Sequence, residues 1–318
     1  MKAITLSKNG DIENLIVKEV ARPNLQPGEV LIQTKALSVN PVDNFVRAYS
    51  QAMETYLQPV PGEDIIIGWD VAGVVTETGA AVKGLKKGDE VFGLIKFPGN
   101  GKGYAGYVAA PADQLASKPS NISFEEAAAA TLAALTAWQS LVTYGKVQKG
   151  EKVLIHAAAG GVGHFAVQLA KYLGAYVIGT ASGANREFVL SLGADEFIDY
   201  TKEKFEEKIK DADLVLDPIA GDHVLRSLDA VRPGGRVITL LSYFEGPIAE
   251  KARAKDIFTH RLDVVSNGED QRHIAALLEK GALRTRISET FSFDEMGKAH
   301  QQIATGKTRG KIAVKVDF

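Results

Sequence analysis

The stretch Val153-Leu154-Ile155-His156-Ala157-Ala158-Ala159-Gly160-Gly161-Val162-Gly163 decides the fold of this chain. Its apolar start predicts a buried strand, its small residues predict a tight turn, and the segment that follows predicts an amphipathic helix through Leu173 that Gly174 ends. Such a turn lets a diphosphate approach the unpaired N–H groups of a helix N-terminus, where the helix dipole also favours negative charge. Gly160 permits this approach, and Gly163 permits close packing of the helix on the strand.

The motif alone is weak evidence for a dinucleotide site, because Ala158 replaces the first glycine of G-x-G-x-x-G. A purely structural turn is the alternative. The context favours binding, because helix-length segments separate the strands that we expect at residues 152–156, 176–180, 196–198, 214–217, 236–240 and 262–265. This alternation predicts right-handed βαβ crossovers and a doubly wound, parallel α/β sheet of the Rossmann type.

The rest of the chain has a different pattern. Residues 1 to about 120 contain short Val- and Ile-rich runs, such as 29–34 and 71–76, broken by Pro-Gly and Lys-Gly-Asp turns. They predict an antiparallel, barrel-like region, and the Ala-rich segment 125–142 predicts a helix. Short strands return after Gly281 and end in 310–316, which we expect to rejoin the first region.

Composition excludes several classes of protein. The chain has 318 residues, 45% of them apolar, and a net charge of −2 with scattered basic residues, which argues against a nucleic-acid partner or an anionic membrane surface. No cysteine is present, so disulfides, thiolate nucleophiles and cysteine-ligated zinc are excluded. The N-terminal residues lack the apolar core of a signal peptide, and no apolar stretch approaches the length of a membrane span. We therefore expect a cytoplasmic protein with a small-molecule partner.

The end of the second strand bears on the choice of cofactor. An acidic residue there would bind the ribose 2′-hydroxyl of NADH, but residues 179–186 contain none. Ser182 and Asn185 can donate hydrogen bonds, and Arg186 could supply a positive charge. NADPH is therefore favoured over NADH, although Arg186 could equally be a solvated residue in the first turn of the next helix.

Further motifs stand in a fixed order along nearly the whole chain: Ser38-Val39-Asn40-Pro41-Val42-Asp43, Gly68-Trp69-Asp70-Val71-Ala72-Gly73-Val74-Val75, Gly84-Leu85-Lys86-Lys87-Gly88-Asp89-Glu90-Val91, Thr131-Leu132-Ala133-Ala134-Leu135-Thr136-Ala137-Trp138, the phosphate loop, Leu192-Gly193-Ala194-Asp195 and Gly310-Lys311. Together they resemble the zinc-independent medium-chain dehydrogenases/reductases of the quinone oxidoreductase (zeta-crystallin-like) family.

The resemblance implies a GroES-like domain over residues 1–122 and 286–318, a Rossmann domain over 123–285, an active site in the cleft between them, and a homodimer formed mainly through the Rossmann sheets. It also implies NADPH contacts from Thr131, Gly160, Gly161, Val162, Ser182, Tyr200, Leu240, Ser242 and Lys311, with Asn40 close to the nicotinamide.

Two departures bear on the site. Many relatives resemble Ser-Ala-Lys-Asn or Ser-x-Arg-Asn where this chain has Ser182-Gly183-Ala184-Asn185, so the usual basic residue falls on Ala184 and Arg186 would have to replace it. The zinc-containing alcohol dehydrogenases need a catalytic cysteine and a Gly-His-Glu segment, where this chain has Gly68-Trp69-Asp70. No metal site is expected.

The reaction implied is hydride transfer from NADPH to a quinone or a small α,β-unsaturated carbonyl compound, whose conjugation spreads the incoming charge onto oxygen. Asn40, Tyr49 and Tyr56 are the candidate donors to that oxygen. Their alternatives are structural: a turn for Asn40 and packing for the tyrosines. Asp43 is expected to be a helix N-cap.

The histidines have structural interpretations. His156 ends a buried strand and His164 lies on a helix, so both are expected to be satisfied structural residues, and His223, His260, His273 and His300 share no metal-ligand spacing. Asp217 could equally face the cofactor or initiate a turn with Pro218.

Two other classes of protein compete with an enzyme of this family. An NADPH-binding structural or regulatory protein with little turnover would lack donors around the nicotinamide, whereas Asn40 is present. A Rossmann methyltransferase would need an acidic residue near 180–182, which is absent.

Overall fold

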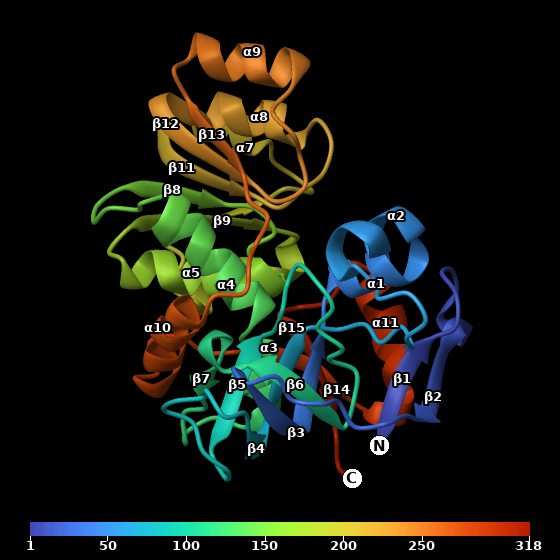
Figure 1. Cartoon of the computed structure of the whole chain (residues 1–318). Helices are drawn as coiled ribbons and strands as arrows, with labels where there is room; N and C mark the ends of the chain where they lie inside the picture. The colour runs from blue at the N-terminus through green and yellow to red at the C-terminus, as the bar shows by residue number, and fades with distance from the viewer. The chain divides into compact units, whose positions relative to one another are not determined.

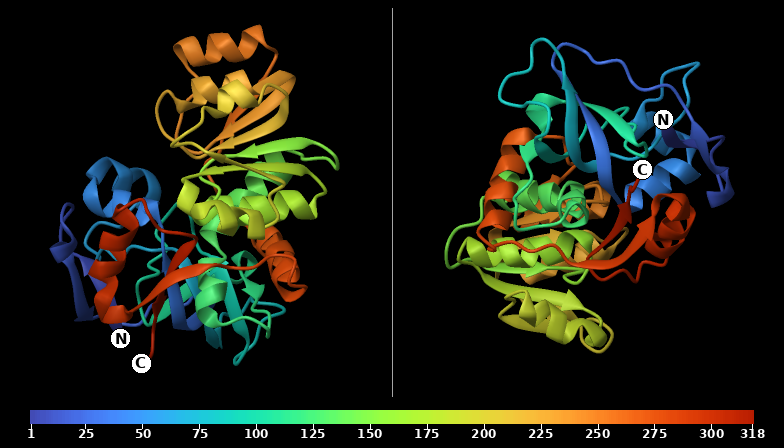
Figure 2. Two further views of the ribbon diagram at one scale, coloured as in Figure 1. Left: turned by 180° about the vertical axis from the view of Figure 1, so that it is seen from behind. Right: turned by 90° about the horizontal axis from the view of Figure 1, so that it is seen from below.

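The computed structural model describes all residues from 1 to 318, in two compact units (Figures 1 and 2). We call Met1–Leu135, Val264–Gly281 and Thr285–Phe318 the barrel unit, and Thr136–Asp263 with Ala282–Arg284 the Rossmann unit. Each unit has its own sheet and core and is described by itself.

The Rossmann unit has a six-stranded parallel sheet (Figure 1). Its strands lie in the order β10-β9-β8-β11-β12-β13, which is the 3-2-1-4-5-6 order of dinucleotide-binding sheets. The doubly wound sheet expected from the sequence is thus confirmed. The bounds are β8 Lys152–Ile155, β9 Tyr176–Ala181, β10 Glu196–Asp199, β11 Ala212–Asp217, β12 Val231–Thr239 and β13 Phe258–Arg261.

The last strand lies earlier than predicted. The expected strand at 262–265 is wrong, because β13 ends at Arg261 and residues 262–265 are irregular. β13 is an edge strand, so its own residues are only partly covered, whereas Leu262 and Val264 just beyond it are buried. The apolar run in the sequence therefore marks buried loop residues and not the strand.

Helices connect these strands. They are α5 Gly161–Tyr172, α6 Arg186–Ser191, α7 Phe205–Lys208, α8 His223–Ala230, α9 Gly246–Ala254 and the 3-10 helix η5 Gly183–Asn185; the π-helix η4 Gln139–Tyr144 precedes the first strand. One part of the core joins Leu154, Val215 and Val237 of the central strands to Phe205 and Leu228 of the helices. The helix expected through Leu173 is confirmed, with Gly174 in the left-handed conformation that ends it.

The barrel unit is mainly antiparallel (Figure 2). Its seven-stranded sheet has the order β14-β15-β3-β4-β5-β7, and β6 also pairs with β3. The bounds are β3 Glu29–Val39, β4 Asp70–Thr78, β5 Glu90–Leu94, β6 Tyr107–Pro111, β7 Ala116–Ser117, β14 Ile287–Ser292 and β15 Lys311–Lys315. β1 Lys2–Leu6 and β2 Leu15–Glu19 form a separate antiparallel pair. Ile312 of β15 pairs with Val39 of β3, so the end of the chain does rejoin the first region.

The helices of the barrel unit include one departure from expectation. The helix predicted over 125–142 is divided into α3 Phe124–Ala129, α4 Leu132–Trp138 and η4. Thr131 lies at the break and donates its hydroxyl to the carbonyl of Ala128, while Asp70 from β4 accepts the N–H of Leu132. A buried carboxylate from another element thus starts a new helix where local propensity favours continuation. The remaining elements are α1 Pro41–Ala48, α2 Ser50–Ala52, η1 Ile12–Asn14, η2 Met53–Leu57, η3 Ala112–Gln114, α10 Gly268–Glu279, η6 Phe293–Glu295 and α11 Met296–Ala304.

The two units divide the chain at 135/136, 263/264, 281/282 and 284/285, whereas the domain boundaries predicted from the sequence lie at 122/123 and 285/286. The reason is packing: α3 lies against β3, β4 and β15, and α10 lies against β7. The predicted boundaries stay a prediction about which segments fold independently. No helix in the chain is both long and apolar enough to cross a lipid bilayer.

Candidate functional site

The phosphate loop leaves β8 and enters α5. Gly160 is the N-cap of α5, and a Cβ built on it would meet only the carbonyl oxygen of Ala157, at 3.2 Å. A Cβ on Gly163 would lie 2.1 Å from that same oxygen, so the close packing expected of Gly163 is confirmed. The first-turn N–H groups of Gly161 and Val162 have no preceding helical carbonyl to bind. No side chain lies within 4 Å of a Cβ built on Gly160, and this open space fits a dinucleotide diphosphate.

The loop after β9 carries the residues expected at the ribose. Ser182 accepts a hydrogen bond of 3.0 Å from the side chain of Asn185, and the Arg186 guanidinium lies over the ring of Phe197, 5.5 Å from its centroid. Tyr200, directly after β10, is exposed. The Asn185–Ser182 contact holds the two polar side chains of the loop together.

Sequence reasoning missed a carboxylate beside this loop. Asp199 ends β10, the neighbour of β9, and its Oδ2 lies 2.5 Å from the position of a Cβ built on Gly183. Only the strand order brings it there, since it is 16 positions from Gly183 in the sequence. A search of the strand adjacent to β9 for a terminal acidic residue would have found it.

The segment after β12 contributes two further expected contacts. Ser242 is buried and its hydroxyl lies 3.2 Å from the carbonyl oxygens of both Ile219 and Gly221. Leu240 is half-buried, and its N–H donates to the carbonyl of Asp217 over 3.2 Å. These bonds tie the segment after β12 to the loop after β11.

A hydrogen-bonded group at the carboxyl ends of β8, β9 and β11, which we call the histidine cluster, joins His156, Thr180, Asp217, His223 and Ser227. The Thr180 hydroxyl lies 3.0 Å from Nδ1 of His156, whose Nε2 lies 3.2 Å from the Ser227 hydroxyl. Asp217 Oδ2 accepts from Ser227 at 2.7 Å and pairs with Nδ1 of His223 at 2.9 Å. The predicted structural role of His156 is confirmed, as is that of His164, whose Nδ1 bonds the carbonyl of Gly160.

The protons of the histidine cluster form one consistent set. If His156 carries its proton on Nε2, it accepts from Thr180 and donates to Ser227, which donates in turn to Asp217. Burial lowers the pKa of His156 to about 3, so the ring is neutral at physiological pH. Burial raises the pKa of Asp217, but the hydrogen bond from His223 and the nearby histidines bring it below its ordinary value.

The ligand atoms of His156, Asp217 and His223 lie within 4.8 Å of one another, a group that could hold a metal ion. Sequence spacing did not predict it, because the three residues belong to different elements. Each of these atoms already has a hydrogen-bond partner on the chain, so a metal ion would have to displace these bonds. Asp217 also accepts the N–H of Ile219, which confirms the turn interpretation of Asp217-Pro218.

In the barrel unit, Asp70 is the centre of a buried polar group that we call the Asp70 cluster. One carboxylate oxygen of Asp70 accepts from the Asn40 side chain at 2.7 Å, and the other accepts the Leu132 N–H at 3.1 Å. The Lys311 ammonium lies 3.7 Å from Asp70 and donates to the amide oxygen of Asn40. Asn40, Lys311 and the start of α4 after Thr131 are thus held by one side chain.

Asp43 completes this cluster but is not the predicted N-cap. Asn40 is the N-cap of α1, and Asp43, in the first turn, accepts the Asn40 N–H at 2.6 Å, because a carboxylate three residues into a helix can reach back to the cap. Burial, and next the charge of Asp70, raise the pKa of Asp43 to about 7. Burial lowers the pKa of Lys311 although Asp70 and Asp43 oppose this shift.

The two predicted tyrosines differ in environment. Tyr49 is 59% exposed beside Phe45 on α1, with ring centroids 5.2 Å apart. Tyr56 is half-buried and stacks on Phe97 at 5.9 Å. Asn40 is buried within the Asp70 cluster. The three predicted donors therefore lie in different environments within the barrel unit. Asn40 is the one whose side chain is held by hydrogen bonds, to Asp70 and Lys311.

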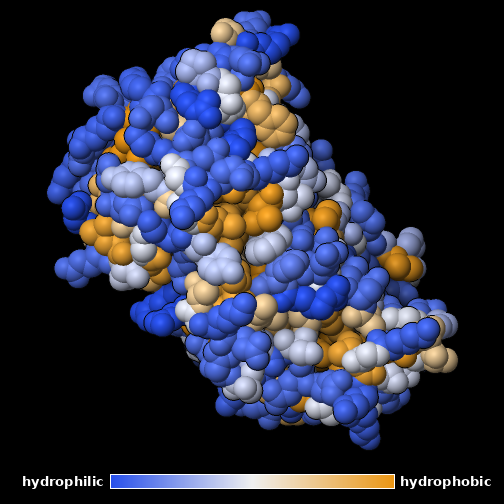
Figure 3. All heavy atoms as spheres, turned by 90° about the vertical axis from the view of Figure 1, so that its left-hand side faces the viewer, coloured by the Kyte–Doolittle hydropathy of each residue, from blue (hydrophilic) through white to orange (hydrophobic).

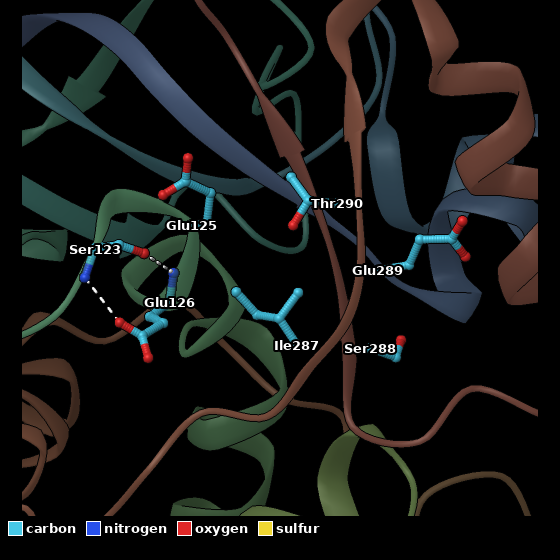
Figure 4. Close-up of a pocket in the computed structure, with 7 residues that line it drawn as sticks. All are labelled: Ser123, Glu125, Glu126, Ile287, Ser288, Glu289 and Thr290. Atoms are coloured by element: carbon cyan, nitrogen blue, oxygen red, sulfur yellow. Dashed lines mark hydrogen bonds between the residues drawn. The ribbon is translucent and has the colours of Figure 1, made fainter.

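A surface cavity of about 470 Å³ in the barrel unit contains none of the predicted site residues (Figure 4). Figure 4 shows its lining of Ser123, Glu125 and Glu126 from the start of α3 and residues 287–290 of β14. Glu126 and Ser123 bond each other in a helix cap and are satisfied there. We assign this cavity no functional role.

The fold and the phosphate loop define the class: an oxidoreductase-type Rossmann unit joined to a GroES-like barrel, the architecture of medium-chain dehydrogenases/reductases. Residues 26–120 match the alcohol dehydrogenase GroES-like domain, and residues 192–314 match a family described as zinc-binding dehydrogenase. These two matches confirm the predicted combination of domains.

Comparison with known proteins narrows this class. The chain is 36% identical to 2-methylene-furan-3-one reductase of Solanum lycopersicum, over 99% of this chain and 79% of that protein. It is similar to the structure of the quinone oxidoreductase from Coxiella burnetii, with a TM-score of 0.90 and 35% identity over 100% of this chain and 99% of that one. The Escherichia coli quinone oxidoreductase complexed with NADPH gives a TM-score of 0.86 and 25% identity over 99% and 100%. The chain belongs to the quinone oxidoreductase family of medium-chain dehydrogenases/reductases.

Proposed function

We propose that this protein is an NADPH-dependent reductase of quinones or small α,β-unsaturated carbonyl compounds. The observation that carries the proposal is the open phosphate loop at the carboxyl end of β8, in a sheet of the 3-2-1-4-5-6 order and in a chain of this family. Relatives named as a furanone reductase and as quinone oxidoreductases, one of them complexed with NADPH, support this chemistry.

The proposed cofactor contacts are backbone N–H groups of the phosphate loop and a set of side chains. Gly160, Gly161 and Val162 would bind the diphosphate through backbone N–H groups, because no side chain lies within 4 Å of a Cβ built on Gly160. The other proposed contacts are Asn40, Thr131, Ser182, Asn185, Tyr200, Leu240, Ser242 and Lys311. Arg186, which the sequence offers as a cation for the 2′-phosphate, lies over the ring of Phe197 instead. The Asp70 cluster supports three of the proposed contacts, since it fixes the amide of Asn40, the ammonium of Lys311 and the helix start after Thr131.

NADPH, when bound, supplies the hydride. The protein must orient the acceptor and donate hydrogen bonds to the oxygen on which charge develops. The Asn40 amide has two N–H bonds, and the structure uses one of them for Asp70. Its remaining N–H, with the hydroxyls of Tyr49 and Tyr56, forms the proposed donor set. The reaction needs no metal in this proposal, because conjugation in the acceptor spreads the charge.

The first experiment follows NADPH oxidation, against NADH, with a quinone, a conjugated enone and a simple ketone. We expect turnover with NADPH on the quinone or enone and little on the ketone. Tight NADPH binding without turnover on any acceptor would refute the enzyme proposal and favour the structural or regulatory alternative.

The donor set is tested by substitution. Tyr56→Phe and Tyr49→Phe each remove one hydroxyl and keep the ring, so kcat should fall while the NADPH dissociation constant stays unchanged. Removal of one oxyanion donor typically lowers kcat by about 10²-fold. Unchanged kcat in both variants would remove the tyrosines from the donor set.

We also propose a homodimer through β13. This strand is the open edge of the Rossmann sheet, and the aromatic residues Phe258 and Tyr144 near it are exposed, with Tyr144 stacked on His260 at 3.9 Å. An open strand edge with apolar neighbours is a template for pairing with a second copy. Apolar side chains reach the surface in patches on the face drawn in Figure 3.

The molar mass of the protein, measured by light scattering as it elutes from a size-exclusion column, tests the dimer. Phe258→Lys should yield a monomer, whereas Tyr172→Lys, at another exposed aromatic residue of the same unit, should not. A monomeric wild-type protein, or a Phe258→Lys variant that stays dimeric, would refute this interface.

The cytoplasmic location stays a prediction that imaging of a tagged full-length chain can test.

A further inference from the structure

The loop after β9, residues 182–186, which we call the ribose loop, has a carboxylate beside it where NADPH would place its 2′-phosphate. The inference drawn from this charge rests on the proposed use of NADPH. Asp199 lies against Gly183 in this loop, with Oδ2 2.5 Å from the position of a Cβ there. The Thr201 hydroxyl, which donates to Asp199 at 2.7 Å, holds the pKa of this carboxyl below its ordinary value. An ionised carboxylate beside the loop opposes the approach of a 2′-phosphate. A cation must therefore offset it.

Two cations are available near the loop. The Lys202 ammonium lies 3.7 Å from Oδ2 of Asp199, and its side chain is 77% exposed. The backbone N–H of Lys202 also donates to the carbonyl of Asp199 at 3.0 Å, which fixes the turn that carries this lysine. The Arg186 guanidinium lies instead over the face of Phe197, 5.5 Å from the ring centroid, a contact that favours this orientation of the side chain.

We propose that Lys202, and not Arg186, is the side chain that recognises the 2′-phosphate of NADPH. Lys202 pairs with Asp199 and so presents a solvent-exposed ammonium beside the carboxylate that lies against Gly183. Ser182 and Asn185, already joined by a hydrogen bond, supply neutral donors to the same phosphate.

The test uses two fragments that carry the alternative ribose ends: 2′,5′-ADP, which has the 2′-phosphate, and 5′-AMP, which lacks it. Calorimetry gives the dissociation constant of each for the wild type, Lys202→Met and the matched control Arg186→Met. We expect Lys202→Met to weaken 2′,5′-ADP by about tenfold to a hundredfold, as loss of a charge-assisted contact predicts. Binding of 5′-AMP should change by less than about twofold, because the fragment has no charge at that position.

The same variants distinguish the inference from the proposed function. The ratio of KM for NADPH to KM for NADH should rise in Lys202→Met and stay near the wild-type value in Arg186→Met. Loss of 2′,5′-ADP affinity in Arg186→Met alone would overturn the inference and leave NADPH use intact. Equal affinity of the wild type for the two fragments would overturn both the inference and the NADPH preference.

A second variant checks the role of Asp199. Asp199→Asn keeps an oxygen that can accept from Thr201 but removes the charge. It should tighten 2′,5′-ADP in the Lys202→Met background and so restore part of the lost affinity. No restoration would show that Lys202 does not act against this carboxylate and would overturn the proposed mechanism.

Discussion

Replacement of Asp70 by asparagine tests how the barrel unit holds its proposed cofactor contacts. Asp70→Asn keeps the shape and removes the charge. Asp70 is almost fully buried, and its two oxygens accept from Asn40 and Leu132, while Lys311 lies 3.7 Å away. In the variant, one acceptor oxygen becomes an amide NH₂ that faces another donor, and Lys311 loses its nearest anion.

The magnitude follows from these contacts. Loss of one hydrogen bond to a charged group costs about 1.5–3 kcal/mol, and removal of one partner of a buried ion pair costs about 3–5 kcal/mol. The two effects share the same carboxylate, and Lys311 can lose its proton in response, so they do not add. We expect a decrease of about 3–5 kcal/mol in the free energy of unfolding of the barrel unit.

Urea unfolding measures this change. The chain has two tryptophans, so a Trp138→Phe background leaves Trp69, directly beside Asp70, as the reporter of the barrel unit. Lys311→Met and the double variant complete a thermodynamic cycle, whose coupling energy should exceed about 2 kcal/mol. A loss below about 1 kcal/mol in Asp70→Asn, or a coupling energy near zero, would refute the reasoning that Asp70 organises this cluster.

Three further predictions concern other parts of the chain. Asp43 has a folded-state pKa of about 7 against an ordinary value of 3.8, so its protonated form stabilises the fold fully below pH 3.8, and this stability is lost as the pH rises to about 7. The Tm of Asp43→Asn should therefore rise relative to the wild-type Tm as the pH increases from about 5 to about 8. A difference in Tm that does not depend on pH would argue against the pKa shift. Gly163→Ala places a Cβ 2.1 Å from the Ala157 oxygen and should lower both Tm and NADPH affinity. A Cβ on Gly160 would lie 3.2 Å from the same oxygen, a tight contact that a small shift relieves, so Gly160→Ala should lower Tm less than Gly163→Ala and should also lower affinity. Equal Tm values for the two variants would contradict this. Dialysis against EDTA should leave the NADPH-dependent rate unchanged, because the histidine cluster is already paired internally; a loss that Zn²⁺ restores would identify that cluster as a metal site.

The local sequence predicted the elements whose signals lie in consecutive residues. The apolar run before Gly160, the small residues of the turn and the helix to Leu173 determine the phosphate loop, because strand and helix periodicities are properties of neighbouring positions. The same reasoning located five of the six Rossmann strands. It misplaced the sixth, since partial burial at a sheet edge leaves no apolar run in the strand itself.

Tertiary structure alone decided which side chains meet. Asn40, Asp70 and Lys311 come from positions far apart in the chain, and the pairing of β15 with β3 and of β3 with β4 brings them together. Strand order likewise places Asp199 beside the loop that carries Gly183. The physical reason is that a sequence records each segment's own preference for helix or strand, whereas sheet order and register set the distances between segments, and charges act only across those distances.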